Sequence, residues 1–219
     1  MGDDMARTGL LALATIGAIA AALSLSGCTT PSSEQAPAAP SVSAEPTIDP
    51  GPVVLTGEDA ATRYLSIVCP INVATRSLNE AYAAGEPEYL AGGAPDVSAV
   101  VAAAVVIQEG QRLAIEQLDE TYFIWPELVA PQIAHVRSTY MANMAVVTAV
   151  ALSTSFEEAY QVPAAAQTPE EQAAGQEIRY QLGLSADTDS SCVGYENGLS
   201  LLSAEKSERD AALAKQDSE

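Results

Sequence analysis

The sequence predicts an all-α protein, a bundle of four to five helices with a largely buried third helix, preceded by a disordered linker. From residue 57 onward, apolar residues recur at spacings of three and four, which place them on one face of a helix. Runs of alternating β-branched residues are scarce, and glycine and proline gather at a few places between the helical stretches. Each helix then has one apolar stripe to bury, and other helices are the surfaces available for it.

Residues 1–27 have the pattern of a secretory signal peptide. No side chain between Thr8 and Gly27 is charged, and the segment is rich in leucine, isoleucine and alanine. It is about long enough to cross a bilayer as a helix. Arg7 precedes it, as in the basic head of a signal peptide. Two alternatives therefore fit the segment: a signal peptide that is removed, or a permanent membrane helix.

The last residues of this segment distinguish between the alternatives. Leu25-Ser26-Gly27-Cys28 resembles the lipobox of bacterial lipoproteins, in particular those of high-GC Gram-positive bacteria. The resemblance implies cleavage between Gly27 and Cys28, a diacylglyceryl group on the Cys28 sulfur and often a further acyl chain, such as palmitate, on the new amino group. Two or more acyl chains anchor a protein stably. We therefore expect a lipoprotein anchored in the lipid bilayer of the cell membrane and facing outside the cytoplasm; an uncleaved anchor with an incidental cysteine is the alternative.

The segment after the lipobox is predicted to be a spacer. Residues 29–56 contain six prolines, no aromatic residue and no basic residue. Such a composition cannot bury enough apolar surface to offset the chain entropy, so we expect residues 28–56 to be disordered. A flexible coil of this length spans roughly 30 Å. The linker would hold a single folded domain, residues 57–219, away from the lipid.

The first two helices are predicted from their stripes and end signals. The first begins after Thr56, which can form a capping pair with Asp59, and its stripe reaches Tyr82. Glycine and proline predict a loop over residues 83–96. The second helix runs from residue 96 or 97 to Tyr122, where Phe-Ile-Trp-Pro ends it, because a residue before proline avoids helical geometry.

The third helix has a different composition. Between Leu128 and Phe156 the only formally charged side chain is Arg137. A helix that is apolar nearly all round is buried on most sides, so we expect residues 128–152 to form the central helix of the bundle. A second membrane span is the alternative, but the uninterrupted apolar runs are far shorter than about 20 residues.

The C-terminal part predicts two further helices. Thr168 can cap the first, Pro169 and two glutamates open it, and Gly183 closes it. A loop over residues 185–198 follows. The last helix begins near Leu199, and we expect its final ten residues or so to fray.

The charge of the chain limits its partners. It holds 29 acidic and 9 basic residues, a net charge of −20, and most of the acidic residues lie after residue 56. This field repels polyanions, so we expect neither nucleic acid nor anionic lipid headgroups as partners. A solvated acidic surface accounts for the charge without a specific cation site.

One stretch begins like a calcium loop. Asp187, Asp189 and Ser191 alternate as the first ligands of an EF-hand do. Cys192 stands where the loop needs its glycine, and Gly198 stands where it needs the bidentate glutamate. The stretch therefore does not form an EF-hand, and a calcium site of another kind is the alternative.

Other metal and catalytic patterns are also incomplete. A two-iron bundle needs Glu-x-x-His on two helices, but His135 is the single histidine and Gln132 precedes it by three residues. One histidine and scattered cysteines do not make a zinc ligand set. Ser203-Ala204-Glu205-Lys206 has the Ser-x-x-Lys spacing of penicillin-binding enzymes without their companion motifs. We therefore expect no metal, no cofactor and no catalytic residues.

Three functions remain open. The leading hypothesis is a non-enzymatic lipoprotein whose bundle binds or scaffolds another envelope component. The second is a small-ligand carrier with a pocket between helices, for which Tyr122, Trp125 and Tyr140 could supply aromatic walls; core packing is their alternative role. The third is an enzyme on a helical scaffold, which the shortage of histidine and lysine disfavours.

The two remaining cysteines are predicted to form a disulfide. With Cys28 assigned to lipid, Cys69 beside Pro70 and Cys192 in the loop before the last helix form an even pair. Disulfides persist outside the cytoplasm. In the chain-entropy model, closing so long a loop stabilises the fold by about 4 to 5 kcal/mol. The alternative is a buried free thiol at Cys69 and an exposed one at Cys192.

Overall fold

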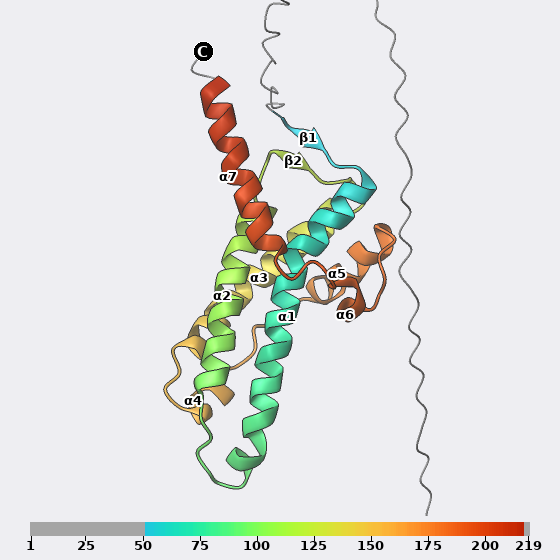
Figure 1. The fold of residues 1–219 in the computed structure, drawn as a ribbon. Coiled ribbons are helices and arrows are strands. Elements are labelled where there is room, and N and C mark those ends of the chain that lie inside the picture. Colours follow the sequence, from blue (N-terminus) through green and yellow to red (C-terminus); the bar gives the residue numbers. More distant parts are fainter. Residues whose placement is uncertain (1–50, 217–219) are drawn as a thin grey trace, which may run out of the picture. The chain divides into compact units, whose positions relative to one another are not determined.

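The computed structural model describes residues 51–216 and has the predicted all-α architecture (Figure 1). The lipobox, the cleavage position at Gly27 and Cys28, and most of the linker lie outside the described residues. Within them the only strands are two-residue segments, β1 (Val53–Val54) and β2 (Phe123–Ile124). The helices are α1 (Gly57–Leu90), α2 (Ser98–Leu118), α3 (Ala130–Ala151), α4 (Phe156–Tyr160), α5 (Pro169–Gln181), α6 (Thr188–Ser191) and α7 (Gly198–Gln216).

Three long helices form the centre of the domain. α1 and α2 lie side by side in opposite directions, and α2 also packs along α3 (Figure 1). α5 packs on α3, while α7 packs on α1 and α2. The main core lies among these helices. A smaller core lies at α4, where Phe156 packs with Val100 and Val150; burying a side chain such as Phe156 stabilises the fold by roughly 1.5 to 3 kcal/mol.

The ordered domain begins earlier than the predicted linker boundary. β1 and β2 pair in parallel, with Val53 opposite Phe123. The Leu55 N–H donates to the Ile124 carbonyl at 2.9 Å, and the Leu55 side chain is buried. The predicted linker, residues 28–56, therefore extends too far. A two-residue strand is too short to show an alternating pattern, and its partner lies about seventy residues further along the chain.

α1 is longer than predicted. The loop expected over residues 83–96 is helical as far as Leu90, and the helix passes through Pro87. Gly85 lies where the ring of Phe156 packs, and a Cβ at Gly85 would come within 2.4 Å of that ring. Contact with α4 thus requires a glycine inside the helix. Here packing between distant segments overrides the local preference of glycine and proline for a loop.

α2 and α3 are shorter than predicted. α2 ends at Leu118, and Tyr122, which was expected at its end, belongs to the segment that pairs with β1. α3 ends at Ala151. Phe156 instead begins α4, for which the Ser155 hydroxyl accepts a capping hydrogen bond. A serine whose side chain bonds a nearby backbone N–H favours a new helix start over the continuation of the old one.

One side of α3 is buried and the opposite side is exposed. Ile133, Val136, Val147 and Val150 form the buried side. On the other side Met141 is 50% exposed within the described residues, and the burial of this helix on most sides stays a prediction. The uncharged α3 face, as we call this surface, consists of Ala130, Pro131, Ala134, Ser138, Met141, Ala142, Ala145, Ala149 and Leu152.

Both ends of α5 are as predicted. Thr168 and Glu171 form a capping box, in which the Glu171 N–H donates to the Thr168 hydroxyl at 3.2 Å and the Thr168 N–H donates to the Glu171 carboxylate at 2.9 Å. Gly183 follows with φ of 66°, the left-handed conformation that ends many helices. α7 begins at Gly198 and continues to Gln216, into the region where fraying was expected.

By length and composition, α2 is the one described helix that could cross a membrane. The core helix of a water-soluble domain has the same properties, and α2 packs against both α1 and α3. Its exposed side carries Arg112, which pairs with Glu109 at 2.7 Å and with Glu116 at 3.4 Å. Length and composition therefore do not identify α2 as a membrane span.

Candidate functional site

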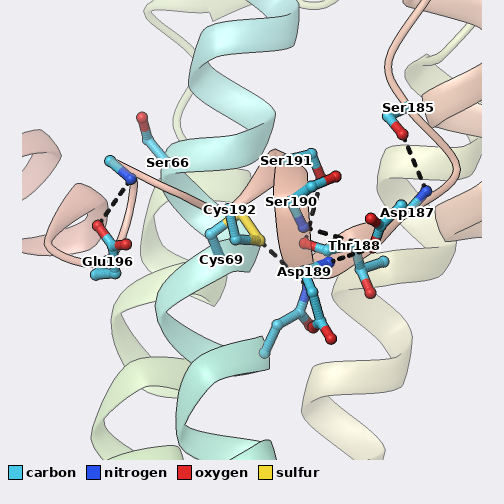
Figure 2. Close-up of a disulfide and its surroundings, with 12 residues drawn as sticks. Ser66, Cys69, Ser185, Asp187, Thr188, Asp189, Ser190, Ser191, Cys192 and Glu196 are labelled. Carbon is cyan, nitrogen blue, oxygen red and sulfur yellow. Dashed lines mark hydrogen bonds between the residues drawn. A yellow bond between two sulfur atoms is a disulfide. The ribbon is translucent and has the colours of Figure 1, made fainter. Parts of the chain in front are cut away.

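The two cysteines predicted to pair lie together (Figure 2). Their sulfur atoms are 2.09 Å apart and their Cα atoms 5.2 Å apart, across 123 residues of sequence. Cys69 comes from the middle of α1, and Cys192 is the first residue after α6. Both side chains are buried. The pair ties the segment that contains α6 to α1.

The residues that resemble the start of a calcium loop have a structural role. Asp187 is the N-cap of α6, and its carboxylate accepts hydrogen bonds from the N–H groups of Asp189 and Ser190 (Figure 2). The hydrogen bond with Ser190 is the main reason that the pKa of Asp187 is lowered. Asp189 pairs instead with Arg76 of α1. Among the described residues, no group of three or more His, Cys, Asp and Glu side chains is placed to hold a metal ion.

The three aromatic residues predicted as pocket walls lie in three different places. The guanidinium of Arg209 lies over the ring of Tyr122, with the Arg209 Cζ atom 4.1 Å from the ring centroid. Trp125 packs against the main core. Tyr140 lines a cleft between α1, α3 and α5. Of the three, Tyr140 is the one that lines this cleft.

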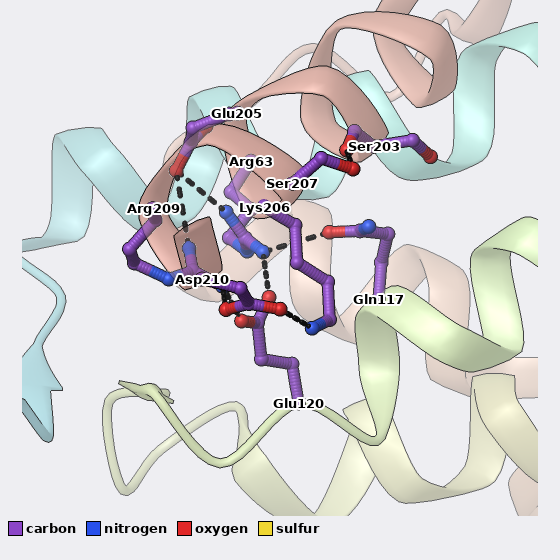
Figure 3. A network of polar contacts seen from close by, with 9 residues as sticks. All are labelled: Arg63, Gln117, Glu120, Ser203, Glu205, Lys206, Ser207, Arg209 and Asp210. Carbon is purple, nitrogen blue, oxygen red and sulfur yellow. Dashed lines mark hydrogen bonds and ion pairs between the residues drawn. The ribbon is translucent and has the colours of Figure 1, made fainter. Parts of the chain in front are cut away.

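Where α1, α2 and α7 meet, two buried arginines share one buried glutamate (Figure 3). Arg63 donates to one carboxylate oxygen of Glu120 at 2.9 Å, and Arg209 donates to the other. All three side chains are 6–7% exposed. The side-chain Oε1 of Gln117 accepts from Arg63, and the half-exposed Glu205 lies 3.8 Å from Arg63 and 3.6 Å from Arg209. Asp210 lies 3.7 Å from Arg209 and also pairs with Lys206, so three positive charges meet three negative charges.

Aromatic rings complete this arginine–glutamate network. The Arg63 guanidinium stacks 4.0 Å from the ring centroid of Phe123, as that of Arg209 does over Tyr122. Burial lowers the pKa of Arg63 to about 10; Glu205 opposes this shift, and the like charge of Arg209 adds to it. The network joins α1, α7 and the segment between α2 and β2. Its charges are balanced by its own residues, so it leaves no charge for a ligand to neutralise.

A third arginine is buried without a carboxylate partner. Arg179 of α5 is 2% exposed. Its Nη1 donates to the Ser185 carbonyl at 2.8 Å and to the Ser191 hydroxyl at 2.7 Å, and both acceptors are neutral. Its Nη2 has no hydrogen-bond partner among the described residues. Buried charges in proteins are ordinarily paired. Arg179 helps to lower the pKa of Asp187, but it has no hydrogen-bonded carboxylate of the kind that Arg63 and Arg209 have.

Arg179 lies in the wall of a cleft of about 250 Å³ between α1, α3 and α5, which we call the Arg179 cleft. Tyr64 of α1 and Thr139 and Tyr140 of α3 line the same cleft. The Thr139 hydroxyl is buried and has no hydrogen-bond partner among the described residues. The Tyr64 hydroxyl donates to the Gly175 carbonyl over a long 3.4 Å. Underused donors from three helices therefore meet in one small space.

The ionisation of the cleft follows from burial. Burial raises the pKa of Tyr64, with Arg179 opposing the shift, and burial also raises the pKa of Tyr140. Both phenols stay protonated at neutral pH and can donate hydrogen bonds. Glu171 lines the cleft as well, and its hydrogen bond with Ser138 at 2.7 Å helps to lower its pKa. The cleft thus has a cation in its wall, neutral donors beside it and one ionised carboxylate.

The sequence reasoning found Tyr140 but missed Arg179, Tyr64 and Thr139 as site residues. Arg179 is the only basic residue between Arg137 and Lys206, and that isolation was the available signal. The other members of the cleft depend on which helices meet, which residue spacing does not reveal. No protein-family model matches the chain, and comparison with curated proteins and with solved structures gives no match either.

Proposed function

We propose that the chain is a lipid-anchored protein of the outer face of the cell membrane, whose helical domain binds another component of the cell envelope and catalyses no reaction. The observation that carries the anchor is Leu25-Ser26-Gly27-Cys28 at the end of an uncharged segment. The pairing of Cys69 with Cys192 supports an oxidising compartment, because disulfides are rare in the cytoplasm. The scarcity of histidine and lysine supports a binding role over catalysis.

The anchor is tested by changing the cysteine that would carry it. Cys28→Ala should abolish labelling by a clickable fatty acid, because the sulfur that takes the lipid is gone, and should release the chain from the membrane fraction or block its processing. Ser24→Ala, in the same segment but outside the lipobox, should leave labelling unchanged. Full labelling of the Cys28→Ala chain would contradict the proposal.

The uncharged α3 face is the surface that we assign to the envelope partner. The nine residues of this face are uncharged, although the chain as a whole carries a net charge of −20; the charge of the adjacent, partly exposed Arg137 is paired with Asp119. Most of these side chains are as small as alanine, so the backbone of α3 can be approached closely. Contact surfaces are depleted in charge at their centres. We therefore expect a protein partner with an uncharged, closely packing surface of its own.

A photo-crosslinking amino acid at Ala145 of the anchored chain, in the cells that produce it, tests this surface. We expect one specific product from Ala145, and we expect Ala142→Glu to remove it because the glutamate places a charge in the contact. Ala142 is exposed, so Ala142→Glu should leave the melting temperature nearly unchanged. The same probe at Ala173, an exposed position on α5, is the control. An equal product from Ala173, or a product from Ala145 that Ala142→Glu leaves intact, would refute the assignment.

A second candidate function is the carriage of a small ligand. It is supported by the Arg179 cleft, where a buried guanidinium and a buried hydroxyl have unused hydrogen-bonding capacity. Ligand sites are commonly concave, with a few convergent polar groups. Both functions are compatible with one chain, because the cleft depends on α1, α3 and α5, and the uncharged α3 face is the exposed side of α3.

A further inference from the structure

We propose that the Arg179 cleft is a binding site for a small organic monocarboxylate. The inference rests on the second of the two functions proposed above and names the class of ligand. It does not depend on the lipid anchor or on the uncharged α3 face.

The charge of Arg179 is the first reason. The guanidinium is 2% exposed, and its two hydrogen bonds go to neutral oxygens of Ser185 and Ser191. Nη2 makes no hydrogen bond among the described residues, and Arg179 is one of the residues that line the cleft. A carboxylate oxygen near Nη2 would supply an opposite charge hydrogen-bonded to the guanidinium and accept one of the N–H groups of Nη2, and such charge-assisted hydrogen bonds are stronger than neutral ones.

The neutral donors of the cleft are the second reason. The Thr139 hydroxyl is buried without a partner, and the Tyr64 hydroxyl has only a long hydrogen bond to a backbone carbonyl. The Tyr140 hydroxyl lines the same space. Hydroxyl groups of this kind can donate to an anion, whereas a cation would meet the positive charge of Arg179. The site is therefore complementary to an anion in its hydrogen bonds as well as in its charge.

Charge and volume limit the anion to a small monocarboxylate. Arg179 has no hydrogen-bonded carboxylate, so one negative charge can pair with it. The ionised Glu171 in the cleft, and Asp187, whose pKa Arg179 helps to lower, oppose a second negative charge. The net charge of −20 adds a long-range penalty for multiply charged ligands. A cleft of about 250 Å³ has the volume of about eight water molecules. It can enclose the carboxylate and a short or aromatic carbon skeleton, which the tyrosine rings and Val136 would contact.

The test measures binding of acetate, butyrate and benzoate to the full chain in detergent, by ligand-observed NMR and by the rise in melting temperature. Benzyl alcohol is the neutral probe of similar shape, and inorganic phosphate is the probe with higher charge. We expect at least one carboxylate to bind, benzyl alcohol and phosphate to bind more weakly, and Arg179→Gln to lower carboxylate affinity by about tenfold or more. Arg137→Gln, which changes a partly exposed arginine of α3, is the matched control and should have no effect.

Thr139→Val keeps the shape of the side chain and removes only the hydroxyl, so it serves if Arg179→Gln fails to fold. We expect it to lower affinity about three- to tenfold with little loss of stability. Carboxylate binding that neither variant changes would overturn the site. Stronger binding of phosphate or benzyl alcohol in the same cleft would overturn the monocarboxylate class while leaving a carrier function in place. No binding of any probe would overturn both.

Discussion

The domain buries arginine in two places, and the two differ in how the charge is neutralised. Arg63 and Arg209 share Glu120, have Glu205 nearby and lie over aromatic rings. Arg179 is equally buried, but its hydrogen bonds go to a backbone carbonyl and a serine hydroxyl. In the first place each arginine has a carboxylate partner within the chain, although Nε and Nη1 of Arg209 make no hydrogen bond among the described residues. The second has a free Nη2 and an adjoining cleft.

The difference separates structural from functional burial of charge. Placing an arginine in a protein interior costs several kcal/mol, which an ion pair with good geometry offsets. The arginine–glutamate network meets that condition and joins three segments of the chain. At Arg179 this cost is only partly offset, by hydrogen bonds to neutral oxygens, and a buried charge that is only partly paired is typical of ligand-binding sites. The variants below test the contrast, from the largest expected effect to the smallest.

Opening the disulfide should affect the two places unequally. Cys69→Ala with Cys192→Ala removes a cross-link over 123 residues, so we expect the free energy of unfolding to fall by about 4 to 5 kcal/mol. Ser191, an acceptor for Arg179, is adjacent to Cys192. Hydrogen exchange in the folded protein should therefore rise around α6 and the end of α5 more than around Arg209. A uniform rise would show that the disulfide does not support the Arg179 cleft in particular.

Removing the shared carboxylate should have the next largest effect. Glu120→Gln leaves Arg63 and Arg209 buried without the group that pairs them, and breaking a buried ion pair costs about 3 to 5 kcal/mol. Urea unfolding measures the change. Glu116→Gln is the matched control, because Glu116 forms only a surface ion pair with Arg112, worth less than about 1 kcal/mol. Similar losses for both variants would mean that the network is not the closed unit described here.

Removing Arg179 should cost much less. Arg179→Met loses two hydrogen bonds but also removes a buried charge that has no carboxylate partner, and we expect the two effects to offset each other to within about 1 kcal/mol. Arg63→Met is the comparison and should cost about 3 kcal/mol, because it leaves part of the Glu120 carboxylate unpaired. Equal losses in urea unfolding would place Arg179 in the same structural class as Arg63.

Local signals predicted part of this architecture, and contacts between distant segments decided the rest. The capping box of Thr168 and Glu171 and the turn at Gly183 depend on neighbouring residues, so their sequence pattern was sufficient. The cysteine pair followed from elimination. The extension of α1 through Gly85 was hidden because it depends on Phe156, about seventy residues away.

The sites were hidden for the same reason. Tyr64 reaches the backbone of α5 across 111 residues, and Arg63 meets Glu120 across 57. Spacing along one helix identifies a buried face but does not say which face of another helix it meets. The composition of α3 also left its surroundings undecided, because a lack of charged residues is found both in buried helices and on exposed surfaces of small side chains.

A last predicted effect, which changes little at pH 7, appears at high pH, where the two places should respond in opposite directions. Burial raises the pKa of Tyr140 above its ordinary value of about 10, so the folded protein holds that proton more tightly than the unfolded chain. Its contribution to stability is complete below pH 10 and is lost as the pH rises toward the folded-state pKa. For Arg63 the folded-state pKa is lowered to about 10, so its contribution instead grows between pH 10 and 12.5.

Tyr140→Phe should therefore reduce the loss of stability above pH 10 and change little at pH 7. The slope for one group is at most about 1.4 kcal/mol per pH unit, so unfolding free energies are best measured at closely spaced pH values. Tyr180→Phe is the control, because Tyr180 is 79% exposed and its hydroxyl is in water in both states. If the slope of stability against pH above pH 10 is unchanged in Tyr140→Phe, the Tyr140 hydroxyl is accessible to solvent. The Arg179 cleft would then be filled with water, and an anion bound to Arg179 there would gain no more than at an exposed arginine.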